Sequence, residues 1–320
     1  MPLPWSADSR GFEAYSIDGV SSVIEAMVYG EPLGAKTPIF ILNSHEFFGP
    51  PSKVFCDTAW DAGYQVILIR RPGIVGSTPL PEVLTQVSTV RSGAAVAAEA
   101  AILSKFITQH VKTGAVVLSL GGSNPVAYRL THFCKQVGLF VFANPTFNQN
   151  VWGSFSPDWF RRILEQVIAS KSGVHVSSLG IKHFLKRDPL SFYRQILAQS
   201  AGDLEYLKVN EKDFIKAGAL AQTATTAQLH YELSINFQLD PLLKPGVFNQ
   251  RPVLVVSGAE ANASWVEGLT QECRRLSVPL ELFPSGFIFG PYHAPDYFFE
   301  LVKRSVGYIS NNSDAQNKAV

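Results

Sequence analysis

The segment 115–130, AVVLSLGGSNPVAYRL, constrains the fold of this chain more than any other. Its first six residues are apolar apart from Ser119 and predict a short strand buried on both faces. Gly121 and Gly122 then permit a tight turn, with Ser123 at its apex. Pro125 suits the first turn of a following helix, because the N–H that proline lacks would be unpaired there anyway. A strand, a sharp turn carrying a serine and a helix are therefore expected in direct succession.

Similar short apolar runs recur along the chain, with helical segments between most of them. Strands are predicted at residues 11–19, 21–29, 38–43, 65–69, 115–120, 139–142, 252–257 and 280–283. Helices are predicted at residues 53–63, 92–110 and 295–309 and directly after the turn at Ser123. This order predicts an α/β fold whose central sheet is mostly parallel and carries helices on both faces.

The segment 151–245 differs from the rest, because helical periodicity dominates it and no convincing strand appears. Helices are expected at residues 156–168, 191–199, 211–222 and 225–235. We therefore predict a core formed by residues 1–150 and 246–320, with residues 151–245 inserted as a helical cap in one compact unit. The polar residues 310–320 are expected to form a disordered tail.

Composition excludes several classes of function. The net charge is +1 and there is no dense Lys/Arg run, so nucleic acid is not an expected partner. The three cysteines have no CxxC spacing, which argues against a disulfide framework or a zinc site. No signal peptide and no membrane span is recognisable. We expect a cytoplasmic protein without metal or cofactor that acts on a small molecule, and the sequence leaves a homodimer open.

Five segments together resemble the α/β-hydrolase superfamily with a helical cap, and they are spread over nearly the whole chain. They read PIFILNSHEFFGP, QVILIRRPGIVGST, AVVLSLGGSNPVA, RPVLVVSGAEANAS and FPSGFIFGPYHAPDYF. The resemblance implies a nucleophile elbow of the pattern G-x-S-x-G at the turn after the strand at 115–120. This chain has Gly121-Gly122-Ser123-Asn124-Pro125 there, so the first glycine matches and the last does not.

In that register Ser123 is the expected nucleophile. The same serine could instead serve as a helix N-cap, and the two roles are compatible. An alternative register with Ser119 as nucleophile would place Pro125 deeper in the helix, where its ring clashes, and we reject it.

An oxyanion hole is expected beside the nucleophile. Its donors would be the backbone N–H groups of Asn124 and of the region around Ser44 and His45. Asn43 and Gly122 are expected to line the same pocket. Ser44 and His45 belong to a loop that is expected to line this pocket as well.

The other catalytic positions of the superfamily are altered here. The resemblance places an acid at residue 261 and a histidine at residue 287, where this chain has Ala261 and Phe287. Glu260 and His293 are the nearest replacements for the acid and the base, and His45 is a second candidate base. Asn144 could orient a partner, although an amide cannot stabilise an imidazolium as a carboxylate does. Arg70 stands where the superfamily usually has an aspartate.

Three functions follow from this pattern. The first is an enzyme acting on a small, largely apolar ester, thioester or related carbonyl compound, with Ser123 as nucleophile. The second is a non-hydrolytic enzyme resembling hydroxynitrile lyases or cofactor-free dioxygenases, with His45 as base. The third is a catalytically inactive protein that binds a ligand. A serine hydroxyl is a weak nucleophile without a base, so the substitutions at 261 and 287 weigh against a simple esterase. The strand–turn–helix segment around Ser123 favours a retained pocket, and on balance we expect an atypical enzyme that acts through Ser123.

Overall fold

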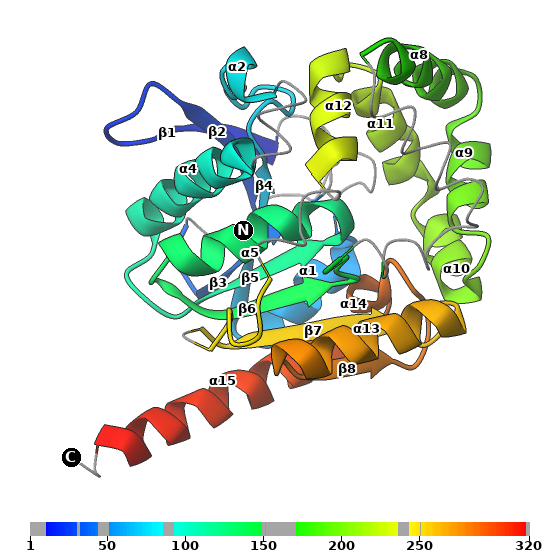
Figure 1. Cartoon of the computed structure of the whole chain (residues 1–320). Helices are drawn as coiled ribbons and strands as arrows, with labels where there is room; N and C mark the ends of the chain where they lie inside the picture. The colour runs from blue at the N-terminus through cyan, green and yellow to red at the C-terminus, as the bar shows by residue number, and fades with distance from the viewer. Residues whose placement is uncertain are drawn as a thin grey trace.

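A computed structural model describes residues 11–30, 33–43, 51–85, 93–148, 151, 171–235, 243–249 and 251–317. Its centre is one eight-stranded sheet in the order β1-β2-β4-β3-β5-β6-β7-β8 (Figure 1). The six strands from β4 to β8 in this order are parallel, whereas β1 and β2 run antiparallel at one edge. The strands are β1 Phe12–Ser16, β2 Val23–Val28, β3 Thr37–Leu42, β4 Tyr64–Arg70, β5 Ala115–Leu120, β6 Val137–Ala143, β7 Val253–Gly258 and β8 Leu280–Phe283. The predicted α/β class with a mostly parallel sheet is confirmed.

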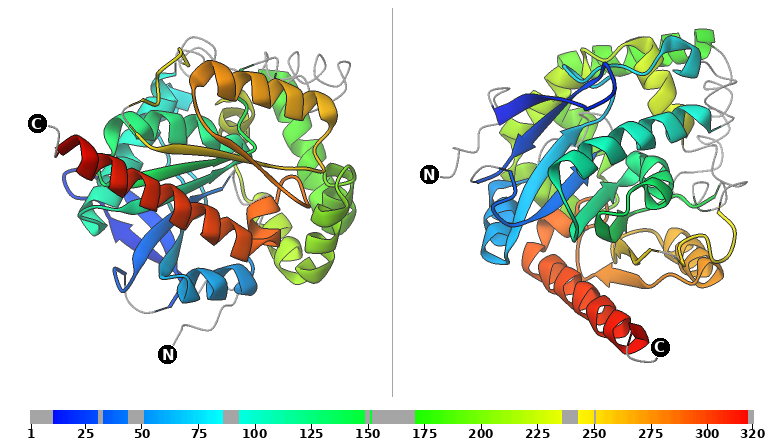
Figure 2. Two further views of the ribbon diagram at one scale, coloured as in Figure 1. Left: turned by 90° about the horizontal axis from the view of Figure 1, so that it is seen from below. Right: turned by 90° about the vertical axis from the view of Figure 1, so that its left-hand side faces the viewer.

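Helices cover both faces of the sheet (Figure 2). Alternate residues of a strand point to opposite faces, so Phe40 and Leu42 join one apolar core while Ile39 and Ile41 join the other. The first core is completed by α4 (Ala94–His110), α5 (Asn124–Phe133) and α13 (Ala263–Leu276). The second is completed by α1 (Lys53–Asp61) and α15 (Pro295–Asn317). Strands buried on both sides need apolar residues at every position, which explains the unbroken apolar runs of the sequence.

Five helices lie together on the side toward which the parallel strands run (Figure 1). They are α8 Lys171–Arg187, α9 Pro189–Ile196, α10 Ala201–Val209, α11 Glu211–Ala221 and α12 Thr226–Ile235. All five come from the segment predicted to form the cap. Helix α12 packs against the 3-10 turn η3 (Gly121–Ser123) that follows β5 and against α2 (Glu82–Thr85). Helix α12 therefore lies at the end of β5, and we call α8 to α12 the cap helices.

Some expectations differ from the structure. Helix α15 continues to Asn317, so most of the segment 310–320 is helical and not the disordered tail that its polar composition predicted. Helices α8, α10 and α13 were not predicted, and the helix expected at 156–168 lies outside the described residues. Cys56, Cys134 and Cys273 are all buried free thiols. None of the helices in the described ranges is long and apolar enough to cross a membrane.

Candidate functional site

The turn after β5 has its strained residue two positions earlier than the sequence indicated. Gly121 follows the strand directly and has a φ of 51°, in the left-handed region that favours glycine. Ser123 is the last residue of the 3-10 turn and has an ordinary φ of −82°. In a nucleophile elbow the nucleophile occupies the strained position between strand and helix. The prediction that Ser123 stands at the apex is therefore wrong, because the apex residue is Gly121, which has no side chain.

The hydroxyl group of Ser123 is enclosed and fully hydrogen-bonded. The residue has no exposed surface, and its Oγ donates to the carbonyl of Leu42, at the end of β3, over 2.6 Å. The same oxygen accepts the backbone N–H of Leu120 at 3.1 Å and lies 2.8 Å from the hydroxyl of Ser119. A carbonyl oxygen does not remove a proton from a hydroxyl group, so none of the hydrogen-bond partners of Ser123 among the described residues acts as its base. Its contacts tie the turn to strand β3.

The expected oxyanion donors are also arranged differently. The backbone N–H of Asn124 donates to the carbonyl of Gly121, so it is not free to bind an oxyanion as predicted. With Gly121 at the apex, the N–H of the next residue, Gly122, takes the place of that donor. The backbone carbonyl of Asn43 accepts from Arg71, and its Oδ1 accepts the Tyr292 hydroxyl at 3.3 Å. Ser44 and His45 lie outside the described residues.

Asn124 carries an unfilled acceptor beside this turn. Its Nδ2 donates to the carbonyls of Gly121 and Ala143 at 2.8 and 2.9 Å. These two bonds fix which amide atom is nitrogen, so the other is the oxygen Oδ1. That oxygen is buried and has no hydrogen-bond partner among the described residues. Buried polar atoms are nearly always paired, so an orphan acceptor next to the turn is notable.

The two positions that the superfamily uses for acid and histidine pack together as apolar residues. Ala261, Phe287, Trp265 and Val151 form one small buried cluster. The rings of Trp265 and Phe287 meet edge to face with centroids 5.7 Å apart. Neither Ala261 nor Phe287 can exchange a proton with a ligand. Packed apolar side chains therefore fill this part of the strand edge.

Asn144, at the end of β6, braces the same region. Its backbone φ is 51°, a strained value for a residue other than glycine. Its Nδ2 donates to the carbonyl of Phe287 at 2.8 Å, and its Oδ1 accepts the hydroxyl of Ser257 at 2.8 Å. Both ends of the amide are thus engaged in holding the loop after β8 against β7. Both ends of the Asn144 amide therefore have structural partners, and neither of these partners is a histidine that it could orient.

The predicted replacement acid and base bind other partners. Glu260 accepts the Ser200 hydroxyl at 2.7 Å and the backbone N–H of Gly202 at 2.8 Å, at the start of α10. The N–H of Gly202, followed by the Ser200 hydroxyl, lowers the pKa of Glu260. His293, on α14 (Gly290–His293), has its Nδ1 3.0 Å from the hydroxyl of Ser285. Neither residue is among the hydrogen-bond partners of Ser123.

A cap residue, Asp203 on α10, closes this side of the site. Its carboxylate accepts the backbone N–H groups of Phe287, Ile288 and Phe289 at 3.0, 2.7 and 3.0 Å. Asp203 has no exposed surface, and burial raises its pKa although the three N–H groups favour the charged form. The loop after β8, which carries the histidine in the superfamily, is thereby fixed to the cap.

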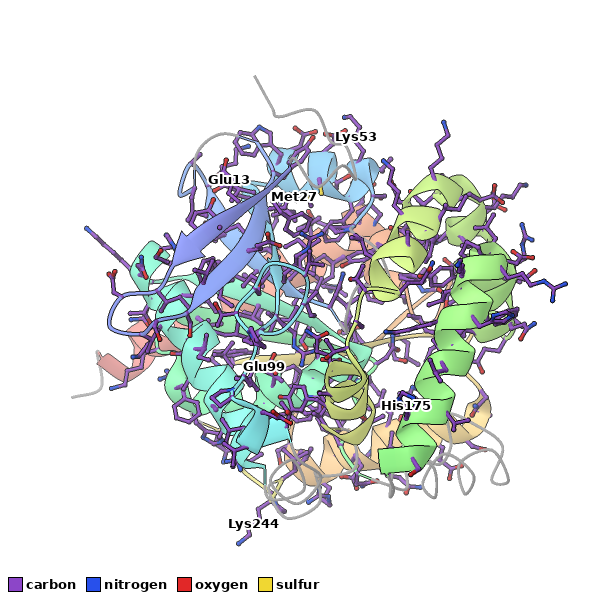
Figure 3. All side chains as sticks on the ribbon, turned by 90° about the horizontal axis from the view of Figure 1, so that it is seen from above. Glu13, Met27, Lys53, Glu99, His175 and Lys244 are labelled. Carbon is purple, nitrogen blue, oxygen red and sulfur yellow. The ribbon has the colours of Figure 1, made fainter. Side chains whose placement is uncertain are left out.

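A buried ion cluster occupies the opposite side of the same sheet edge. Arg71, directly after β4, forms a bidentate ion pair with Glu99 of α4 and a second one with Glu232 of α12. Tyr231 donates its hydroxyl to Glu99 at 2.6 Å. Figure 3 labels Glu99 toward the middle of the molecule, beside α12. We call Arg71, Glu99, Tyr231 and Glu232 the arginine cluster; it joins core to cap.

The two carboxylates of the cluster are not equivalent. Glu99 is fully buried, whereas the side chain of Glu232 keeps 11% of its surface exposed. Burial raises the pKa of Glu232 to about 7, with Arg71 opposing that shift and Glu99 adding to it. One guanidinium cannot neutralise two buried carboxylates, so Glu232 titrates near neutral pH.

The sequence did not point to Glu99 and Glu232. Arg70-Arg71 after a buried strand is a visible signal, because an arginine at a strand end needs an acceptor. Nothing in the local pattern identifies its partners, since Glu232 lies 161 residues away. The apex position could have been found, because the apolar run ends at Leu120 and the next residue is Gly121. No group of three or more His, Cys, Asp or Glu that could hold a metal occurs in the described part of the chain.

The chain matches no known protein-family profile and no curated protein by sequence. Solved structures match it over most of its length. The Cif epoxide hydrolase from Acinetobacter nosocomialis has a TM-score of 0.61 at 14% identity, covering 93% of this chain and 90% of its own. A thermophilic esterase from Thermogutta terrifontis has a TM-score of 0.57 at 14% identity, and the match covers 93% of this chain and 98% of the esterase. A haloalkane dehalogenase variant from Bradyrhizobium elkanii has a TM-score of 0.56 at 12% identity, and the match covers 97% of this chain and 99% of the dehalogenase. The chain has the α/β-hydrolase fold.

Proposed function

We propose that this protein binds a small molecule under its cap and does not hydrolyse it through a covalent serine intermediate. The observation that carries the proposal is the glycine at the strained apex of the turn, where the fold would present a nucleophile. Gly121 offers only backbone atoms to a ligand. In this respect the chain differs from the hydrolases whose fold it shares, because function resides in the site and not in the fold.

Three further features support a binding role over Ser123-dependent hydrolysis. The Ser123 hydroxyl is committed to Leu42, the positions of acid and base hold Ala261 and Phe287, and Asp203 fixes the adjoining loop. The first feature removes a free nucleophile, the second removes the usual base and its orienting acid, and the third fixes the loop that would carry the base. We place the protein in the cytoplasm, as its composition suggests.

A fluorophosphonate probe and short-chain nitrophenyl esters test the absence of a nucleophile. We expect no covalent adduct and no turnover that depends on Ser123. An adduct on Ser123, or ester hydrolysis abolished by Ser123→Ala, would overturn the proposal. A serine esterase treated in parallel controls for the activity of the probe.

Binding at the turn can be tested with a Gly121→Cys variant. The three native thiols are buried, so alkylation by iodoacetamide should report on residue 121 alone. Small apolar compounds that raise the melting temperature of the wild-type protein should slow this alkylation. Compounds that stabilise the protein and leave the alkylation rate unchanged bind elsewhere. If no compound of a broad panel stabilises the protein, the binding proposal fails.

A further inference from the structure

Among the residues that the structure describes, the arginine cluster leaves one negative charge without a counter-ion. Every N–H of the Arg71 guanidinium is used: Nε donates to Glu99, while Nη1 and Nη2 together serve Glu99, Glu232 and the carbonyl of Asn43. Arg71 therefore has no donor left for a ligand. Two carboxylates share this single cation, so the cluster carries a net charge of −1 when both are ionised. Buried charge of this kind is costly unless it is paired.

Glu232 is the member of the cluster that can meet a ligand. Glu99 accepts from Arg71 twice and from Tyr231, and it has no exposed surface. Glu232 accepts only from Arg71, at 3.0 and 3.1 Å, so each of its oxygens keeps a lone pair unfilled by any described residue. It is also the more exposed of the two carboxylates. The unfilled hydrogen-bonding capacity and the surplus charge thus coincide at Glu232.

Asn124 provides an independent second feature. It follows directly on the turn Gly121–Ser123 against which α12, the helix of Glu232, packs. Its Oδ1 is a buried acceptor without a partner in the described part of the chain. The unfilled positions at Asn124 and Glu232 both accept hydrogen bonds, and neither donates. A ligand that reaches either of them must carry N–H or O–H donors.

We propose that the ligand class of this site is a small protonated amine, whose ammonium group donates to Glu232 and supplies the missing positive charge. The inference rests on the proposed binding function and names its substrate class. We take the rest of the ligand to be small and apolar, as the sequence analysis expects of the substrate. An ammonium group is favoured over a neutral donor because only a cation balances the cluster.

Binding of the amine is coupled to a proton. The charged and titratable groups that face Glu232 from the packed elements described are Arg71 after β4, Glu99 of α4 and Tyr231 of α12. Without a ligand, Glu232 holds a proton below neutral pH. The ammonium group must displace that proton, so its affinity should fall as the pH is lowered.

The test compares butylammonium with butyramide and butyrate, which have similar chains but differ in charge. Melting temperatures and calorimetric titrations are recorded at about pH 8, above the pKa of Glu232. We expect butylammonium to bind and to raise the melting temperature, and the other two to give smaller shifts. At about pH 6 its affinity should be about tenfold lower, because only about one molecule in ten then has Glu232 ionised.

Variants assign the effect to the cluster. Glu232→Gln should abolish the preference for butylammonium over butyramide. The control Glu205→Gln removes an exposed carboxylate of α10 that pairs with Lys208, and it should leave the preference intact. If Glu232→Gln does not fold, calorimetric titration of the wild-type protein with butylammonium, in buffers of different ionisation enthalpy, still tests whether binding releases a proton. Near pH 7 we expect proton release on binding, and binding without proton release would overturn the inference.

The outcomes separate this inference from the proposed function. Stabilisation by butyramide or butyrate equal to that by butylammonium would overturn the amine class while leaving a binding protein. No stabilisation by any of the three, at any chain length tried, would overturn both. A preference for butylammonium that persists in Glu232→Gln would also overturn the amine site at this cluster.

Discussion

The two sides of the strand edge differ in how completely their buried polar groups are paired. On the side of β6, β7 and β8, Asn144 and Asp203 bind backbone groups of the loop after β8, and the Ser257 hydroxyl donates to Asn144. On the side of β3 and β4, the arginine cluster pairs two carboxylates with one cation. The first side is closed by satisfied hydrogen bonds, whereas the second retains a surplus charge and open acceptors.

This contrast shows where a binding function can persist when a catalytic one is absent. The fold usually assembles its acid and base on the side that is closed here. Hydrogen bonds from Asn144 and Asp203 replace that machinery and fix the loop after β8. The unfilled hydrogen-bonding capacity at this edge of the sheet lies instead at Glu232, a residue of α12. The predictions below probe each side, beginning with the largest expected effect.

Replacing the cation should damage the charged side most. Arg71→Met leaves Glu99 and Glu232 buried without a counter-ion, and we expect a loss of about 3–5 kcal/mol of unfolding free energy. Urea denaturation measures it. The control Arg194→Met breaks an exposed ion pair with Glu211 and should cost less than about 1 kcal/mol. Equal losses in the two variants would contradict a buried, unbalanced cluster.

The surplus charge predicts a pH dependence of opposite sign to an ordinary carboxylate. The pKa of Glu232 is about 7 in the folded protein against 4.5 for the free group. Its stabilising contribution is therefore complete below pH 4.5 and is lost as the pH rises through 7. Relative to the wild type, Glu232→Gln should gain up to about 3 kcal/mol between these limits. A difference that does not change with pH would disprove the raised pKa.

On the closed side, Asp203→Asn tests the carboxylate that binds the loop after β8. An amide has one acceptor oxygen, so it cannot serve all three N–H groups. We expect a loss of about 2 kcal/mol in urea denaturation, with faster hydrogen exchange at residues 287–289. Unchanged exchange at those amides would show that other contacts hold the loop.

Ser123→Ala should have the smallest effect and should be purely structural. It removes the hydrogen bond to Leu42 and leaves the N–H of Leu120 without its acceptor, at a cost of about 1–2 kcal/mol. Ligand-induced stabilisation should persist in this variant. Loss of ligand response with unchanged stability would instead place Ser123 in contact with the ligand.

Sequence reasoning succeeded where the signal is local and periodic. The strand predicted at 115–120 is β5, Ala115–Leu120, because a strand buried on both faces shows an unbroken apolar run. It failed by two positions at the turn, because a serine is conspicuous while a glycine has no side chain to mark the strained apex. It also chose Glu260 and His293 by proximity along the chain, and both bind other partners.

The sequence by itself determined the alternation of strands and helices, and hence the α/β-hydrolase fold with helices over the strand edge. It did so because hydrophobic periodicity is written in neighbouring residues. Only the tertiary structure decided which side chains meet. Arg71 and Glu232 are 161 residues apart, and Asp203 and Phe287 are 84 apart. Such pairs depend on how the cap closes over the sheet, which no local pattern encodes.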